Sequence, residues 1–473
     1  MESDFKSSNT AALEPHTLRF REKLGYGLGD TASNFFFATF NVFLLYYYTD
    51  IFGLSAAAVG TMFLLTKVLD AVSDPIMGLI ADRTNSRWGK FRPYLLWAAV
   101  PYGLCGYAMF ANPDFSYTGK LIYAYVTYSL MMLAYTAINV PYSALMGVIS
   151  PSSIERTKVA SYRFFCAFAA GWLVGTFVTP LKNILGGENE ALGFQLTMLI
   201  FAVASVALFW ITFATTKERV IPVQTKSDIK LDLKALLSNG PWKALFFTGV
   251  FTLINIAVRN GTLLYYFKYY VGDDGTPIFL IFDKTAVFMS LGLLAMMVGV
   301  SLTKTLSQRF EKRQLMIVLS LLNAASMAAF YFTPPEHYWL MVAINCTGML
   351  AAGPTPALVW SMYADCADYG EWKSERRTTA LVFSTVQFSH KMGLAVGAGL
   401  AGIILSSFGF VANEVQTATS LTGIRFMFSI FPTIFAILGV IAIYFYRIDS
   451  KMIGTIEHDL LQRHAADEQT PDR

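Results

Sequence analysis

Two aspartates lie inside an apolar stretch of the chain, where a carboxylate is costly to bury. In TKVLDAVSDPIMGLIADR (66–83), Asp70 and Asp74 are four residues apart, so they share a helix face, which also carries Lys67. A charge at the bilayer centre costs roughly 2.5–3.5 kcal/mol on insertion scales. An ion pair between Lys67 and one aspartate is the structural alternative, and it leaves the other carboxylate unpaired. The two carboxylates, with the hydroxyl of Ser73, therefore predict a site for Na⁺ or an exchangeable proton.

Other polar side chains also interrupt apolar segments, and they are candidates for binding a substrate. In AYTAINVPYSAL (134–145), polar residues recur at helical spacing. Isolated amides and hydroxyls in membrane helices often join helices to one another, whereas intramembrane charges are rare and usually functional. The candidates are Asn34, Asp30, Tyr135, Asn139, Ser143, Arg163, Arg259 and Lys391.

Composition and segment lengths predict the elements that hold these residues. The chain is 55% hydrophobic and only 14% charged, with a mean hydropathy of +0.47, which indicates a polytopic membrane protein. Windows of about 20 apolar residues predict twelve spans: 25–48, 56–81, 93–111, 120–149, 159–181, 195–215, 243–270, 283–305, 314–333, 338–364, 380–407 and 422–446. We expect an all-α integral membrane protein of two six-helix bundles.

The longest polar connection divides the predicted spans into six and six, which suggests an internal duplication. The expected parts are an N-terminal tail, a first bundle, a central loop, a second bundle and a C-terminal tail, with the bounds 1–22, 23–215, 216–242, 243–447 and 448–473.

The loops between the spans alternate between basic and acidic or nearly neutral composition. Lysine and arginine excess marks cytoplasmic loops, so both termini are predicted to be cytoplasmic. A basic loop after the second span could pair across the inner face with the acidic stretch DCADYGE (365–371) and hold an outward-open state. The predicted gating residues are Asp82, Arg83, Arg87, Arg92, Asp365, Asp368 and Glu371.

Several motifs together resemble a known transporter family. EKLGYGLGD, YYYTDIFGL, VLDAVSDPIMGLIADRTNSRWGKFRPYLL, NVPYSALMGVI, SYRFF and YADCADYGEWK are similar to segments of the glycoside–pentoside–hexuronide:cation symporters. These are relatives of the melibiose permease within the major facilitator superfamily. The chain is nearest in character to the members thought to carry α-xylosides and related plant-wall glycosides.

The resemblance implies a residue-by-residue reading of the site. The cation site of the family falls on Asp70, Asp74 and Thr136, with Ser73 where melibiose permease has an asparagine. In its sugar site, two acids are replaced by Asn34 and Asn139, and an aromatic residue by Ser143. Arg163 and Lys391 match the family's basic sugar-site residues. Asp30, one turn from Asn34, is expected either to offer a substitute carboxylate or to pair with a cation on the cytoplasmic side.

The expected function is therefore symport of a sugar or glycoside (an oligosaccharide, pentoside or hexuronide) into the cell with Na⁺ or H⁺ by alternating access. No organic cofactor and no nucleic-acid partner is expected, and the partners are the sugar, the monovalent cation and the lipid bilayer. We expect a functional monomer in a bacterial inner membrane. A lipid or amphiphile translocator, or a sugar sensor on the same fold, is the alternative. An intramembrane enzyme is disfavoured because the sequence has no HExxH or GxSxG motif.

Overall fold

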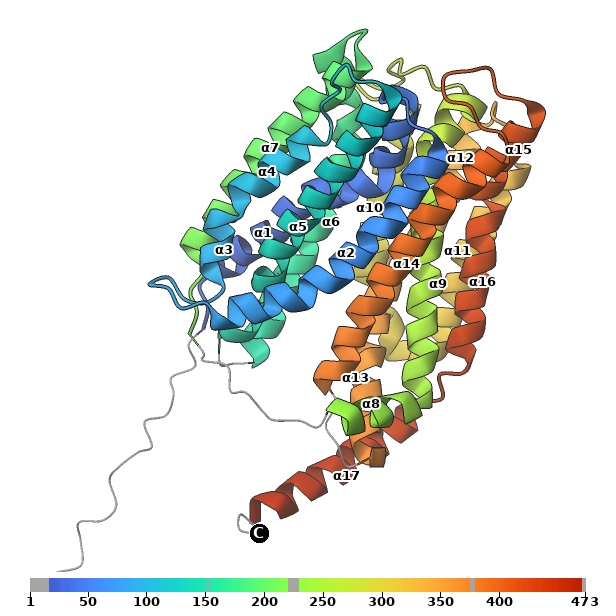
Figure 1. Ribbon diagram of the computed structural model, residues 1–473. Coiled ribbons are helices and arrows are strands. Elements are labelled where there is room, and N and C mark those ends of the chain that lie inside the picture. Colours follow the sequence, from blue (N-terminus) through green and yellow to red (C-terminus); the bar gives the residue numbers. More distant parts are fainter. Residues whose placement is uncertain (1–16, 151–152, 220–228, 375–378, 470–473) are drawn as a thin grey trace, which may run out of the picture.

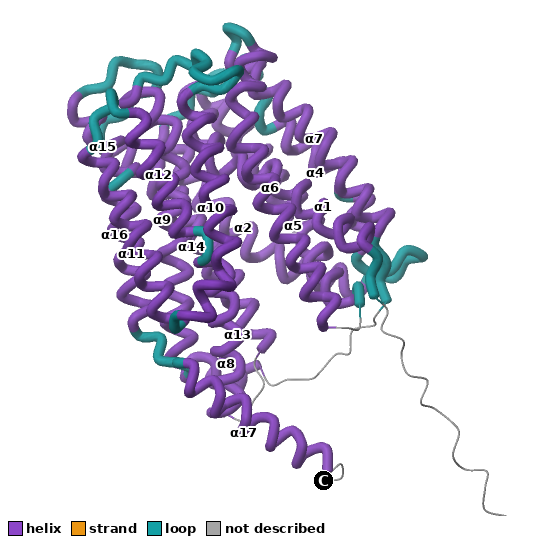
Figure 2. The backbone as a smooth tube through the Cα atoms, turned by 180° about the vertical axis from the view of Figure 1, so that it is seen from behind, coloured by secondary structure: helices purple, strands orange, loops and turns teal. Residues whose placement is uncertain are grey.

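The computed structural model describes residues 17–150, 153–219, 229–374 and 379–469, and these are almost entirely helical. Figure 1 shows long helices running side by side along the molecule, and Figure 2 shows that the loops collect at its two ends. Backbone groups in a bilayer must find partners within their own segment, which a helix provides. The expected all-α class is confirmed.

The first half of the chain forms six passes along the length of the molecule. The first pass is α1 (Phe20–Thr39), which continues through two π-helical segments, η1 (Phe40–Leu44) and η2 (Tyr47–Ile51). The remaining passes are α2 (Ala56–Arg83), the pair α3 (Arg92–Trp97) and α4 (Ala99–Ala108), α5 (Tyr117–Val148), α6 (Ser153–Gly186) and α7 (Glu190–Thr215).

The second half repeats this pattern. Its first pass, α9 (Gly240–Tyr265), again ends in a π-helical segment, η3 (Tyr266–Val271). The others are α10 (Lys284–Arg309), α11 (Lys312–Phe332), α12 (Tyr338–Ala352) with α13 (Thr355–Ser374), α14 (Thr379–Ser407), and α15 (Ala418–Phe428) with α16 (Ile430–Tyr444). Two helices lie outside the passes, α8 (Ile229–Ser238) before the second half and α17 (Ser450–Gln469) after it.

These passes match the twelve predicted spans in number and order. Within the described residues, nine helical segments are long and apolar enough to cross a membrane. The first three passes complete the twelve. The tenth pass is broken at Gly353, whose missing side chain lets α12 approach α10. A Cβ there would lie 2.4 Å from the carbonyl oxygen of Met296.

The helices pack as two halves that meet along a few helix pairs. In the first half α1 packs on α6 and α7, and in the second α9 packs on α14 and α16. The halves touch through α2 with α14, α6 with α10, and η1 with α9. Gly60 on α2 lies against the backbone of Gly399 and Gly402, so α2 and α14 approach each other closely. The proposed bounds of the bundles and tails stay predictions.

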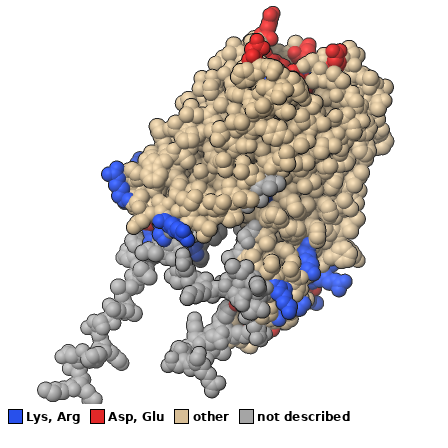
Figure 3. Space-filling model, viewed as in Figure 1, with Lys and Arg blue, Asp and Glu red and all other residues tan. Residues whose placement is uncertain are grey.

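The two ends of the molecule differ in charge. On the face drawn in Figure 3, lysine and arginine gather at one end and aspartate and glutamate at the other. We call these the basic end and the acidic end. The start of α1 and the helix α17 both lie at the basic end (Figure 1). The positive-inside rule makes this end cytoplasmic, which remains a prediction.

An ion cluster holds the start of α1 to the start of α6 at the basic end. Glu155 binds Lys23 and Lys158, both at 2.8 Å, and accepts the backbone N–H of Leu18 at 3.0 Å. These bonds stabilise the charged form and lower the pKa of Glu155 to about 2.

Candidate cation and substrate site

The four side chains predicted to bind a cation lie together between α2 and α5. The hydroxyl of Thr136 lies 3.3 Å from Oδ1 of Asp70 and 3.0 Å from Oδ1 of Asp74, so it can donate to either carboxylate. The hydroxyl of Ser73 lies 3.4 Å from that of Thr136 and 3.2 Å from the carbonyl oxygen of Asp70. The side chain of Asp70 is 4% exposed and that of Asp74 is 26% exposed. The arrangement offers carboxylate and hydroxyl oxygens to a hard cation.

A lysine from the other half of the molecule lies against these carboxylates. Nζ of Lys391, on α14, lies 3.6 Å from Oδ2 of Asp70 and forms an ion pair with Asp74. The sequence predicts Lys391 among the substrate residues and offers Lys67 as an alternative counter-charge. The side chain of Lys67 lies outside the described residues. Lys391 therefore supplies a positive charge from the second half to acids of the first half.

A second polar group lies nearby in the first half, between α1 and α6. Nε of Arg163 lies 3.2 Å from Oδ1 of Asp30, and the guanidinium lies over the ring of Tyr142 at 5.3 Å. Asn34 donates to the carbonyl oxygen of Asp30 at 2.9 Å and to its carboxylate at 3.4 Å. Asp30, and not the residue at position 34, thus supplies the carboxylate that faces Arg163.

The polar stripe of α5 joins this group to the cation cluster. Asn139 accepts a hydrogen bond from Ser33 at 2.8 Å and donates to the carbonyl oxygen of Tyr135 at 3.2 Å. Tyr135 stacks on Phe37 with ring centroids 6.1 Å apart. Ser143 lies exposed one turn beyond Asn139. The residues of α5 therefore border both the carboxylate pair and the Asp30–Arg163 pair.

Arg259 lies apart from the other candidates. It donates to Oδ1 of Asn345 at 3.0 Å, and its guanidinium lies 5.1 Å from the ring centroids of both Phe330 and Phe428. These partners belong to α12, α11 and α15, so its contacts lie within the second half. Cation–π contacts of this kind can hold a partly buried guanidinium in place. A substrate role for Arg259 remains a prediction.

Two of the predicted gating residues, Arg92 and Asp365, bind partners within their own halves. Arg92 donates to the carbonyl oxygen of Phe213 at 2.7 Å, while Asp365 binds Lys312 at 2.7 Å and accepts from Tyr446 at 3.1 Å. Arg87 lies over the ring of Trp88, and the side chain of Asp82 lies outside the described residues. The contact of the basic loop with the acidic stretch of α13 stays a prediction.

Several residues at or near the site were not identified from the sequence. Tyr26 and Tyr142 each donate to the other's carbonyl oxygen, at 3.0 and 2.7 Å, and so hold α1 against α5. Phe164 on α6 contacts Trp360 on α13 across the two halves, with ring centroids 6.3 Å apart. With 24 tyrosines and 39 phenylalanines in the chain, aromatic content alone could not single these out.

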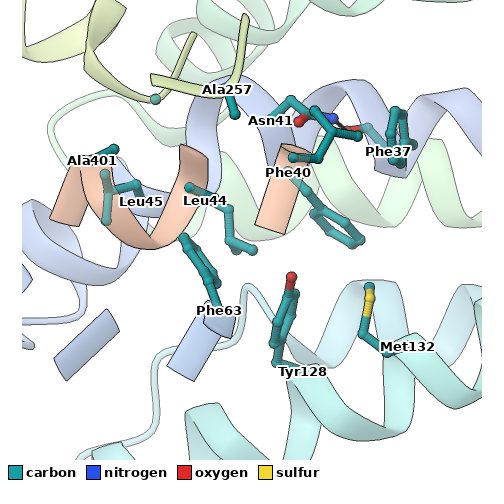
Figure 4. A pocket seen from close by; sticks show the side chains of 13 residues that line it. Phe37, Phe40, Asn41, Leu44, Leu45, Phe63, Tyr128, Met132, Ala257 and Ala401 are labelled. Carbon is teal, nitrogen blue, oxygen red and sulfur yellow. Dashed lines mark hydrogen bonds between the residues drawn. The ribbon is translucent and has the colours of Figure 1, made fainter. Parts of the chain in front are cut away.

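A small cavity lies between the two halves at the level of η1. Figure 4 shows it bordered by Phe37, Phe40, Asn41, Phe63 and Tyr128, with the hydroxyl of Tyr128 pointing inward. The opposite wall is formed by Ala257, Gly261 and residues of α14. Its volume is about 60 Å³, which is room for a few water molecules.

Comparison with known proteins decides the family. The model of the family described as "MFS/sugar transport protein" matches residues 25–450.

This chain belongs to that sugar-transport family.

Two curated proteins are similar to this chain over almost its whole length. The chain is 38% identical over 462 residues to YagG of Escherichia coli (strain K12), covering 96% of this chain and 98% of that protein. It is 33% identical over 468 residues to an isoprimeverose transporter of Lactiplantibacillus pentosus, covering 97% and 96%. The resemblance to glycoside–pentoside–hexuronide:cation symporters is thereby confirmed, and the chain is a multi-pass membrane transporter, not an enzyme.

Solved structures agree on the fold alone. A bacterial homologue of the human lysosomal transporter Spinster, in an inward-facing and unoccupied conformation, superposes with a TM-score of 0.64 at 14% identity. The match covers 92% of this chain and 97% of that one.

Proposed function

We propose that this protein carries a glycoside into a bacterial cell across the inner membrane, together with Na⁺ or H⁺. The observation that carries the proposal is the carboxylate pair on α2. Asp70 and Asp74 share the hydroxyl of Thr136 and face a lysine from the opposite half. Intramembrane acids in such a position mark ion pathways in transporters.

The cation is proposed to bind where Lys391 now lies. Na⁺ or a proton at Asp74 would neutralise the carboxylate and weaken its attraction for the ammonium of Lys391. The lysine would then be free to turn toward the substrate. Because α2 and α14 belong to different halves, this exchange changes a contact between the halves. Cation binding and the relative position of the halves are coupled in this way, and the coupling acts equally in both directions.

The substrate is proposed to bind among Asp30, Asn34, Asn139 and Arg163, beside the cation. Amides can both donate to and accept from sugar hydroxyls, while the carboxylate of Asp30 forms stronger, charge-assisted bonds. Because Asp30 already pairs with Arg163, this group carries little net charge, which favours a neutral glycoside over a hexuronide. Tyr135, Ser143 and Arg259 are kept as further candidates.

Alternating access follows from the two halves moving about this site. In the described residues, the polar bonds between the halves beyond the site lie toward the acidic end. We therefore propose that the structure is closed at the extracellular face and that the basic end is the cytoplasmic one. The predicted contact of Arg83, Arg87 and Arg92 with Asp365, Asp368 and Glu371 would form in the opposite state. The chain is proposed to work as a monomer.

Uptake of radiolabelled glycosides into right-side-out vesicles tests the proposal. A panel containing isoprimeverose, a neutral aryl glycoside and a glucuronide is offered under an imposed Na⁺ gradient, an imposed H⁺ gradient or neither. Concentrative uptake of one neutral glycoside with one gradient is expected. Absence of gradient-driven uptake for all sugars, together with transbilayer movement of a labelled lipid in proteoliposomes, would instead support the lipid translocator.

A further inference from the structure

Asp50 joins the two halves of the molecule near the acidic end. Its side chain is fully buried, and Oδ1 accepts from Nζ of Lys268 at 2.9 Å and from the hydroxyl of Tyr269. Thr49 donates to Oδ2 at 2.8 Å. Asp50 belongs to the first half, while Lys268 and Tyr269 belong to the second. The carboxylate therefore anchors a polar contact between the two halves.

A loop of the second half completes this contact. Asn413, between α14 and α15, donates its side-chain amide to the carbonyl oxygen of Asp50 at 2.5 Å. Its side-chain oxygen accepts from Lys268 at 2.8 Å, and its backbone N–H donates to the hydroxyl of Tyr269 at 2.9 Å. Asn413 has a φ of +61°, a conformation that asparagine tolerates better than most residues. Each of the four groups thus contacts at least two of the others.

The backbone at this contact is unusual on both sides. Asp50 lies in the π-helical segment η2, and Lys268 and Tyr269 lie in the π-helical segment η3. Beside them, the hydroxyls of Thr49 and Tyr265 lie 2.7 Å apart, again between the halves. The wider π turns occur at the ends of the first pass of each half. Such turns are rare and are frequently found at functional sites.

The contact lies at the acidic-end side of the cavity of Figure 4. That cavity is bordered by residues of η1, and the chain passes directly from η1 to η2, where Asp50 lies. At the other end of the second half, the acid Asp365 pairs with Lys312 of its own half. Of these two acids, only Asp50, at the acidic-end side of the cavity, bonds across the halves.

We propose that Asp50, Lys268, Tyr269 and Asn413 form a latch that closes the acidic end and must open in every transport cycle. This inference rests on the proposed alternating-access function and adds the residues that control one of its two gates. When the halves separate, Asp50 and Lys268 become hydrated, so their lost attraction is largely replaced by water. If one of the two charges is removed, the other is left buried without a counter-charge in the closed state. In the open state water surrounds the remaining charge, so only the closed state is destabilised. The equilibrium between the closed and open states of the acidic end then shifts toward the open state.

Labelling of a single cysteine can measure this shift without sugar or cation. Cys105, Cys166, Cys346 and Cys366 are replaced by serine or alanine, and Asn41→Cys places a thiol in the cavity wall. A membrane-impermeant maleimide is added outside right-side-out vesicles. We expect Asp50→Asn and Lys268→Met each to raise the labelling rate at least about tenfold. The charge-exchanged double variant Asp50→Lys/Lys268→Asp is expected to return part of the way to the parent rate.

Asp274→Asn is the matched control, because Asp274 is an acid in a loop at the same end and its bonds are local, to Thr276. It is expected to leave the labelling rate unchanged. Equal rates for the parent, Asp50→Asn and Lys268→Met, with folding verified by size-exclusion chromatography, would overturn the latch. If Asp50→Asn does not fold, Lys268→Met alone decides, since Lys268 is partly exposed. A labelling shift in a protein that transports no sugar would refute the proposed function and leave the latch standing.

Discussion

Lys391 on α14 binds Asp74 on α2, although the two residues are 317 positions apart in the chain. This ion pair joins the two halves of the transporter beside the hydroxyl of Thr136. A cation that binds the carboxylate must compete with the ammonium. Under the proposed function, we expect the same contact to sense the ion and to transmit its binding to the arrangement of the halves.

Neutralising the α2 carboxylates should remove energy coupling. Asp70→Asn and Asp74→Asn keep the side-chain volume but remove the charge that attracts a cation. We expect concentrative glycoside uptake in vesicles to fall by about 100-fold, which corresponds to about 2.7 kcal/mol. Movement of the sugar down its own concentration gradient is expected to persist. Asp274→Asn serves as the control. Intact concentrative uptake in both variants would show that the cation binds elsewhere.

Removing the positive charge of Lys391 should tighten cation binding. Two unit charges about 4 Å apart interact by about 4 kcal/mol at an effective dielectric constant of 20, and partial exposure of the lysine lowers this. Lys391→Met is expected to raise the affinity for the coupling cation about tenfold, measured by calorimetry in detergent. Lys391→Arg keeps the charge and should show little change. A weaker cation affinity in the methionine variant would indicate that Lys391 supports the site instead of competing for it.

The Asp30–Arg163 pair should contribute to both folding and substrate binding. Breaking a buried ion pair leaves one charge without a partner. Because the side chain of Arg163 is 30% exposed, water replaces part of the lost interaction. We therefore expect Asp30→Asn or Arg163→Gln to lower the free energy of unfolding by about 2 kcal/mol. The double variant should recover part of the loss in a thermal-unfolding cycle. Glycoside binding should be lost in all three variants. Recovery of binding in the double variant would mean that the pair is only structural.

Stability should depend on pH through Asp283, in the loop before α10. Burial raises the pKa of Asp283 to about 6, although its carboxylate accepts the N–H of Ala286 and caps α10. Because this pKa lies above the unfolded value near 3.8, the folded state binds the extra proton between these values. Its stability therefore falls as pH rises from about 4 to 6.

Asp283→Asn keeps the N-cap and removes the buried charge. We expect the variant to be more stable than the parent by about 1–3 kcal/mol at pH 7.5, with the advantage shrinking below pH 6 and disappearing near pH 4. Thermal unfolding across this pH range measures the effect, and Asp274→Asn provides the exposed control. A variant that is less stable at pH 7.5 would show that the charge at this N-cap is favourable.

Periodicity and spacing predicted that three polar side chains of α2 lie on one face of the helix. Residues three and four apart on α2 had to share a face, which places Asp70, Ser73 and Asp74 together in any helix. The family resemblance supplied Thr136 from α5, and the structure places its hydroxyl against both carboxylates. The role of the cluster in binding a cation is still a prediction.

Other parts of the site could not be predicted from local pattern. Nothing in the apolar run LLYYFKYY (263–270) shows that Lys268 faces Asp50, which lies 218 residues earlier. For the same reason, the sequence did not show that Lys391 faces the α2 acids or that the contacts of Arg259 lie within the second half. These contacts depend on how each helix is rotated about its axis against a helix that is far away in the chain.

The sequence by itself determined the membrane class, the twelve helical passes, the acidic face of α2 and the family. Each of these follows from hydrophobic length, helical period or short motifs, which are properties of contiguous residues. The tertiary structure alone showed which charges pair across the halves and toward which end the polar bonds between the halves lie. Those features depend on how helices far apart in the chain pack side by side. The residue pattern within one segment does not show which other helix it packs against.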